Sequence, residues 1–540
     1  MAKDQESQKK QIVIISDPLP EKTKFPKSGF CNGRLRFNLL MNISVIGFII
    51  IPFFVPVIYS IGIGYYFAFQ WLIYFMVYLI NTIRLMRAFK KQMKKGQKQQ
   101  KHENEDINST HTNLIDSENN TIIDQTEQKY RYKQIMMTFI YKEPIELLSN
   151  TLFNLREMEG SNQFIVSVGF EERSPDIDNK IKYLNEQFSE SFEEFIITIH
   201  PYGTEGEIPG KCSNSNYLQR KLVAYLEQTR ENFNIEEYMV TNFDTDSRFQ
   251  KNYLRVLESQ MEKTCKKPED IHEIVWQPVI YYNWDLKARR FFVRIISLVR
   301  NMLMMGALIP FQINVMGIFS FSLKLCVTGG YTHPTYQMDD VICQIRWFIK
   351  KKKPIKIKQL YTAAISGPTT GNSFYEELVE WARQIKRWTI GTAEVFHYYV
   401  VKSKHIQPNL KFTVWGFLYF NYYSVFLIAQ NFFTISCAVC FTVLKSDELS
   451  DLEFYLSIGP LGFQYVIFIL MFTINGASQY ILDPIRPKES FNIILTLIHI
   501  IITPFTQIAS GLVACYGIFE VAFRGKKVCN HISSKKDTLK

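Results

Sequence analysis

The stretch EEYMVTNFDTD (residues 236–246) joins an apolar run to a pair of acidic residues. Tyr, Val, Thr and Phe favour extended backbone, so the run up to Phe243 is predicted to form a buried strand. That strand delivers Asp244 and Asp246 to its carboxyl end, which is where ligands bind in an open parallel sheet. Two carboxylates at i and i+2 can share a Mg²⁺ or Mn²⁺ ion and its diphosphate. The alternative is a loop with two solvated aspartates.

The region from residue 131 to 405 repeats the pattern of that strand. Apolar runs such as QIMMTFIY, NQFIVSVGF and EEFIITIH alternate with helical stretches. Strand–helix alternation predicts an α/β domain with a mostly parallel, Rossmann-like sheet. Residues 291–325 are an exception because they are unusually apolar, and both core packing and a face lying on a membrane fit them.

Apolar segments flank this domain on both sides. Residues 37–89 predict two transmembrane helices with a turn at Gly62 and Gly64, and residues 410–522 predict further ones. The expected spans lie near 38–60, 64–86, 414–443, 455–479 and 491–522. The loop DPIRPKES and the basic tail at 523–540 both favour the cytosolic side, which three C-terminal spans do not allow. One C-terminal segment is therefore expected to be re-entrant, interfacial or split.

The remaining segments are polar. Residues 1–36 are expected to be a cytosolic tail, and residues 90–130, rich in Lys, Gln and Asn, a disordered basic linker. The net charge of +11 gathers in lysine runs beside apolar spans, which favours membrane lipid as a partner and excludes nucleic acid for want of a recognition motif. Nine unpatterned cysteines indicate a reducing environment. We expect a multi-pass protein of the plasma membrane or an endomembrane, with its α/β domain in the cytosol.

Two further motifs follow the first acidic pair. In TYQMDDVICQIRW, Asp339 and Asp340 precede a helical run, where they fit either a helix cap or a general base that deprotonates an acceptor hydroxyl. Gln384, Arg387 and Trp388 fall at i, i+3 and i+4, on one helix face. Trp packs on sugar rings, and Arg and Gln bind diphosphate oxygens or hydroxyls. The alternative is an interfacial helix with a Trp anchor.

Taken in order between membrane spans, the D-x-D, D-D and Q-x-x-R-W motifs resemble the family 2 inverting glycosyltransferases of GT-A fold. The membrane-embedded cellulose, chitin and hyaluronan synthases carry this series. The segments TFIYKEP, PGKCSNSNYL and TGGYTHPTYQMDD are similar to further motifs of that family. The resemblance implies a hexosyltransferase that moves a sugar from a UDP-sugar to a growing polysaccharide in a metal-dependent single displacement.

The resemblance also implies a role for each matched residue. Asp340 takes the place of the catalytic base, and Asp246, with Asp244, that of the metal ligand. The implied nucleotide-sugar contacts are Thr138, Glu143, Glu171, Lys211 and Asp244. The implied acceptor and diphosphate contacts are Gln384, Arg387 and Trp388. Glu171 or Glu172 stands where the family usually has an aspartate that contacts the base.

Two other functions stay open at this stage. One is non-processive transfer to a lipid or a short glycan acceptor. The other is an inactive membrane subunit that kept the fold, which the missing second-strand aspartate motivates. A homo-oligomer is compatible with all of these functions.

Overall fold

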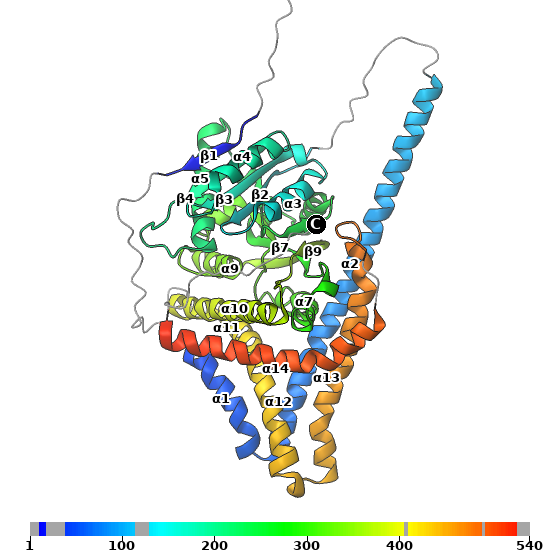
Figure 1. Ribbon diagram of the computed structural model, residues 1–540, viewed down its shortest axis with the longest axis vertical. Helices are drawn as coiled ribbons and strands as arrows, with labels where there is room; N and C mark the ends of the chain where they lie inside the picture. The colour runs from blue at the N-terminus through cyan, green and yellow to red at the C-terminus, as the bar shows by residue number, and fades with distance from the viewer. Residues whose placement is uncertain (1–9, 18–37, 114–128, 404–408, 489–491, 526–540) are drawn as a thin grey trace, which may run out of the picture.

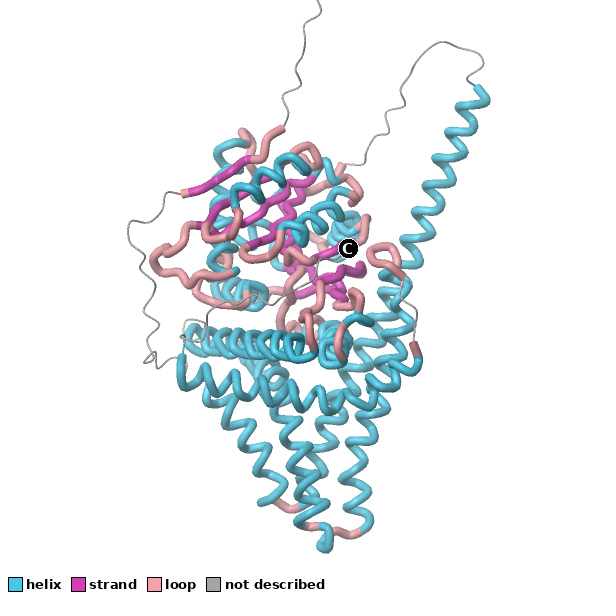
Figure 2. Tube along the Cα trace, viewed as in Figure 1, coloured by secondary structure: helices cyan, strands magenta, loops and turns pink. Residues whose placement is uncertain are grey.

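The computed structural model describes residues 10–17, 38–113, 129–403, 409–488 and 492–525, and of residues 95–113 it describes the backbone only. An α/β domain sits at one end of a bundle of long apolar helices (Figure 1, Figure 2). Most of the tail expected at residues 1–36 and of the basic tail at 523–540 lies outside the described residues.

The predicted strands form the parallel half of the sheet. They are β2 (Lys133–Ile140), β3 (Phe164–Glu171), β4 (Glu194–His200) and β5 (Tyr238–Asn242). Helices cross over between them, namely α3 (Ile145–Arg156), α4 (Ile177–Phe188) and α5 (Lys211–Thr229). The prediction of a mostly parallel α/β sheet is confirmed, since β4, β3, β2 and β5 pair in parallel.

The sheet continues beyond β5 with mixed pairing. Its order is β1-β4-β3-β2-β5-β8-β7-β9-β6. The added strands are β6 (Ser247–Phe249), β7 (Ile274–Tyr281), β8 (Phe319–Ser322) and β9 (Lys356–Ser366). β8 runs antiparallel to β5 and β7, and β6 antiparallel to β9.

One strand comes from the segment expected to be only a tail. β1 (Val13–Ser16) pairs in parallel with β4 at the sheet edge. The run IVII supplies the β-branched residues, and the Ile12 amide donates to Asn185 Oδ1 at 3.1 Å. Asp17 and Lys221 then form an ion pair at 2.6 Å.

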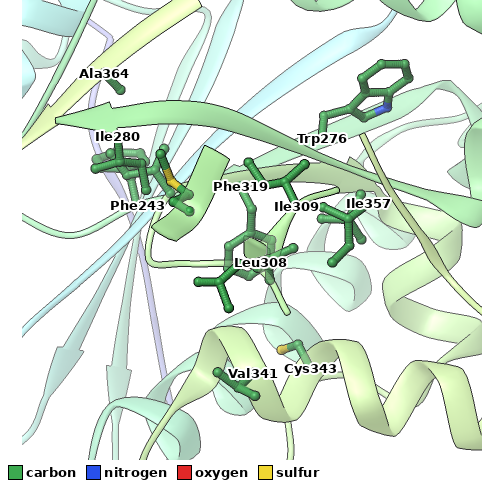
Figure 3. Close-up of a cluster of buried hydrophobic side chains, with 14 of the residues drawn as sticks. Phe243, Trp276, Ile280, Leu308, Ile309, Phe319, Val341, Cys343, Ile357 and Ala364 are labelled. Carbon is green, nitrogen blue, oxygen red and sulfur yellow. The ribbon is translucent and has the colours of Figure 1, made fainter. Parts of the chain in front are cut away.

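The unusually apolar residues 291–325 pack largely inside the protein. They form α7 (Phe291–Leu303), the π-helical turn η6 (Met304–Leu308) and then β8. Figure 3 shows Leu308 and Ile309 between Trp276 and Ile357 of the sheet and Val341 and Cys343 of α9 (Asp339–Lys351). These side chains are all buried, so this run serves mainly as domain core.

Among the residues that the structure describes, five helices are long and apolar enough to cross a membrane, which fits a membrane protein. They are Val57–Lys94, Phe291–Leu308, Leu410–Leu444, Asp451–Leu482 and Ile493–Arg524. A shorter apolar helix, α1 (Leu39–Phe54), precedes them. The turn after α1 lies at Val55 and Pro56 rather than at the expected Gly62 and Gly64, because proline has no N–H and disfavours helical backbone in the preceding residue.

Helix α2 (Val57–Asn113) extends into the expected linker. Residues 90–113 are helical, whereas a disordered segment was predicted from 90 to 130. Lys, Gln and Glu dominate this stretch and lose little side-chain freedom in a helix, which explains the difference. Residues 114–128 lie outside the described residues.

Helix α14 (Ile493–Arg524) is oriented unlike the rest of the bundle. The long helices α2 and α13 (Asp451–Ser478) run away from the sheet, while α14 lies across them, below α10 (Phe374–Ser403) (Figure 1). The connection after α1 and the connection before α13 both lie at the end of the bundle farthest from the sheet (Figure 1). The interfacial alternative among those expected for one C-terminal segment therefore fits α14.

A close helix crossing joins α2 to the α/β domain, and it yields a prediction. A Cβ added to Gly306 would lie 2.2 Å from the Tyr74 carbonyl oxygen, beside a 2.9 Å hydrogen bond from Asn81 Nδ2 to the Met305 carbonyl. Overpacking of this kind costs about 1–3 kcal/mol. We expect Gly306→Val to lower the thermal unfolding temperature in detergent by several degrees.

The matched control for this crossing is Gly62→Val. Gly62 belongs to α2, as Tyr74 does, but a Cβ added there meets nothing within 4 Å. This variant should unfold near the wild-type temperature, and an equal loss in both variants would contradict the proposed role of the crossing.

Candidate active site

One cavity of about 190 Å³ opens at the carboxyl ends of β2, β3 and β5. Strand ends meet at this edge because the strands are parallel, and the starts of α5 and α9 close it from the other side. Nine of the residues singled out in the sequence line it together: Glu143, Glu171, Lys211, Asp244, Asp246, Asp339, Asp340, Arg387 and Trp388.

Lys211 connects the acidic segments of the cavity. Its Nζ lies 2.6 Å from Asp244 Oδ1 and 3.1 Å from Asp339 Oδ2. Asn242, at the end of β5, donates to Asp339 Oδ2 at 3.2 Å. Burial alone would lower the pKa of Lys211, but the charges of Asp244 and Asp339 outweigh burial and raise it. Lys211 is therefore a fixed cation, and Asp339 is held in place by two donors.

The two aspartates of D-x-D occupy different environments. The Asp246 carbonyl accepts from the Gly367 amide at 3.1 Å, and its carboxylate lies 3.5 Å from Ser366 Oγ at the end of β9. Only 1% of Asp246 is exposed, whereas 34% of the Asp244 side chain is. Asp246 is thus rigidly positioned, and Asp244 remains accessible from the cavity.

Asp340 stands in the first turn of α9, where its Oδ1 accepts from the Val341 amide at 2.8 Å. Burial and the neighbouring charge of Asp339 raise the pKa of Asp340, Lys211 opposes both, and the resulting pKa is about 7. A carboxyl group that titrates near neutral pH is suited to accept a proton. The position in the first helical turn and the chemistry of a base are thus compatible.

The residues of the Q-x-x-R-W motif line two different cavities. Arg387 and Trp388 line the cavity, and burial lowers the pKa of Arg387 while Asp244 and Asp340 counteract that effect. Gln384 lines a smaller adjoining pocket, together with Gly367, Pro368 and Thr369. The Arg300 guanidinium lies 3.9 Å from the centre of the Trp388 ring, so it covers one face of that ring.

The implied nucleotide contacts are also divided. Thr138 is fully buried within β2 and does not line the cavity, whereas the next three residues, 139–141, do. Glu143 lines it and accepts from the Tyr141 amide at 2.7 Å. Glu172 accepts from the Tyr202 amide at 2.8 Å, so Glu171 is the member of its pair that faces the cavity.

A buried histidine holds Glu171 from behind. His200 Nδ1 lies 3.2 Å from Glu171 Oε1, and its Nε2 lies 2.8 Å from Glu207 Oε2. Burial alone would lower the pKa of His200, but hydrogen bonds and charge from both carboxylates raise it to about 9. His200 is therefore protonated at neutral pH and fixes the carboxylate of Glu171.

Two residues that the motifs did not single out belong to this region. Arg173 lines the cavity, and its guanidinium lies 3.5 Å from the centre of the Tyr202 ring. Arg300 donates to the Tyr282 hydroxyl at 2.9 Å while it covers Trp388. A charged residue inside the apolar run LVRNML was the available signal for Arg300, and no sequence pattern marked Arg173.

The charges of the cavity fit a divalent cation. Six carboxylates but only three cationic side chains line it, so a diphosphate alone would meet an excess of negative charge. Within the described residues no group of three or more His, Cys, Asp or Glu is arranged to hold a metal ion without other ligands. Asp244 and Asp246 would therefore hold Mg²⁺ or Mn²⁺ together with phosphate oxygens of a substrate, which is how Mg²⁺ usually binds.

Comparisons with known proteins give distant likenesses. No family model and no curated protein matches the chain. The mannosyltransferase PcManGT from Pyrobaculum calidifontis, in complex with GDP-Man and Mn²⁺, is similar at 11% identity and a TM-score of 0.40, over 77% of this chain and 96% of that one. TarS residues 1–349 of S. aureus are similar at 10% identity and a TM-score of 0.30, over 65% and 88%. A longer TarS structure gives 12% identity and a TM-score of 0.30, over 65% and 54%. These likenesses are too remote to carry an argument about this chain.

The contacts of His200 with Glu171 and Glu207 yield a prediction about stability. Because the folded-state pKa of His200 is raised from 6.5 to about 9, its stabilising effect is complete below pH 6.5 and is lost as the pH rises through 9. We expect the unfolding temperature of the wild type to fall between pH 7 and pH 9.5, and that of His200→Gln to fall less. Parallel curves for both proteins, measured by differential scanning fluorimetry, would contradict this assignment.

Proposed function

We propose that the protein is a membrane-embedded, inverting glycosyltransferase that moves a hexose from a nucleoside-diphosphate sugar, with a UDP-sugar as the expected donor. The observation that carries this proposal is the convergence, in one cavity, of Asp244 and Asp246, Lys211, Asp340, and Arg387 with Trp388. An acidic pair, fixed cations and one carboxyl titrating near neutrality are the parts that such a transfer requires.

Donor binding uses the strand ends. The nucleoside is expected between the end of β2 and Glu171, with the diphosphate directed toward Lys211 and Arg387. Glu143 and Arg173 stand at the same side of the cavity and are available to the base and ribose. A bound Mg²⁺ or Mn²⁺ would supply positive charge to the diphosphate as it leaves.

The chemical step is a single displacement. Asp340 accepts the proton of an acceptor hydroxyl, whose oxygen attacks the anomeric carbon of the donor sugar. The bond between that carbon and the diphosphate oxygen breaks, and the nucleoside diphosphate leaves with the electron pair. Lys211 and Arg387 stabilise the negative charge that develops on the leaving oxygen. One displacement inverts the anomeric centre.

The residues of the Q-x-x-R-W motif bear on the acceptor. The Q-x-x-R-W resemblance favours a growing polysaccharide. However, Gln384 lines a smaller, different pocket, and Arg300 covers one face of the Trp388 ring. A sugar ring therefore has no open surface to stack on at that face of Trp388.

The first prediction here concerns Asp340 as the base. A base acts when deprotonated, so kcat/KM of the wild type should fall about tenfold per pH unit below the pKa of Asp340, which is about 7. Asp340→Asn should lower kcat by about 10²–10⁴-fold and leave a residual rate without that pH dependence. The assay follows nucleoside-diphosphate release from pH 5.5 to 8.5, and equal activity of wild type and Asp340→Asn would favour an inactive subunit.

The second prediction concerns the cation. Chelation should abolish activity, and added Mg²⁺ or Mn²⁺ should restore it. Asp246→Asn should need a much higher cation concentration for half-maximal activity, because it removes one carboxylate ligand. Asp178→Asn, on the exposed side of α4, is the matched control and should titrate like the wild type. Unchanged activation of Asp246→Asn would remove this residue from the cation site.

A further inference from the structure

A second cavity, of about 170 Å³, adjoins the first on the side of the helical bundle. We call it the helix-side cavity. Its walls come from α7, α10, α14 and the π-helical segment η7 (Asn421–Ala429). Met338, Asp340 and Trp388 line both cavities. Asp340 therefore stands at the boundary, where a group from the helix-side cavity meets the donor.

The helix-side cavity is mainly apolar. Aliphatic and Met side chains, together with the rings of Trp388, Tyr422 and Tyr423, form most of its wall. Several of its polar groups already have partners within the wall: Thr389 donates to the Ile385 carbonyl at 2.9 Å, Thr392 to the Trp388 carbonyl at 2.8 Å, and Tyr423 to Asn314 Oδ1 at 2.7 Å. Apart from Asp340, Arg300 and Gln507, whose Nε2 has no hydrogen-bond partner among the described residues, the wall offers few partners for the hydroxyls of a sugar chain, whose burial without hydrogen bonds is costly.

Helix α14 connects this cavity to an apolar exterior. Gln507, Ser510 and Ala514 line the cavity. Leu512 and Tyr516 of the same helix are exposed, by 54% and 58%. One helix thus separates the cavity from an apolar outer surface of the kind that lies in lipid.

We infer that the acceptor is a membrane lipid with a free hydroxyl, which it places at Asp340 while its apolar chain occupies the helix-side cavity. This inference rests on the proposed function and narrows its acceptor. The hydroxyl loses its proton to Asp340, its oxygen bonds to the anomeric carbon, and a glycolipid and a nucleoside diphosphate result. A phosphoryl acceptor fits less well, because Asp339 and Asp340 would repel its charge and it needs no base.

The test uses the full chain in phosphatidylcholine nanodiscs with labelled UDP-glucose, UDP-N-acetylglucosamine or GDP-mannose. The lipid probes are diacylglycerol, ceramide and a sterol, and the soluble probes are cello- and chito-oligosaccharides. We expect a product that extracts into organic solvent with the mass of one lipid plus one sugar. A soluble or polymeric product, or Asp340-dependent donor hydrolysis without any lipid product, would overturn the lipid acceptor alone. No turnover of any donor would overturn the proposed function as well.

Variants that fill the cavity give an independent readout. Ala514→Phe should raise the KM for the lipid acceptor about tenfold or more, while the KM for the donor stays near that of the wild type. Leu512→Phe, on the exposed side of α14, is the matched control and should change neither. Ser510→Phe serves where Ala514→Phe does not fold, as judged by unfolding temperature. Unchanged lipid KM in a folded cavity variant would overturn the inference.

Discussion

Lys211 lies between Asp244 and Asp339, and the three side chains belong to the start of α5, the loop after β5 and the start of α9. A buried ammonium is stable only when it is paired, and two carboxylates this close need a cation between them. Each of the three segments therefore depends on the other two for its place. The cavity and the accessible position of Asp244 follow from this arrangement, while the pKa of Asp340 is raised by burial and by Asp339 and is held back by Lys211.

Part of the fold was predictable because its signals are local. The strands β2 to β5 are continuous apolar runs between helical stretches, and a parallel sheet brings their carboxyl ends to one edge. That Thr138 points away from the cavity was not predictable, because seven of the eight residues of β2 are buried. A strand buried on both sides lacks the alternation of apolar and polar residues that would tell its two faces apart. The packing of Arg300 on Trp388 joins segments far apart in the chain, which one sequence does not reveal.

The two cavities meet at one carboxyl group, and this sets its chemistry. On one side of Asp340 lie the charged groups of the first cavity, and on the other lie the aliphatic side chains of the bundle. Removal of water from both sides raises its pKa toward neutrality, where a carboxylate is a stronger base than in solution. The α/β domain alone therefore provides only part of the environment of the Asp340 carboxyl group, and the helical bundle provides the rest.

Strand β1 is the first part of the sheet to be synthesised, yet its partner β4 follows some way along the chain, after α1 and α2. The pairing of β1 with β4 therefore joins segments that lie far apart in the chain, and residues of the same chain close this edge of the sheet. Unpaired sheet edges attract strands from other molecules. With β1 in place, a four-residue strand forms this edge, and it offers a second copy little to pair with. Self-association through this edge is thereby disfavoured.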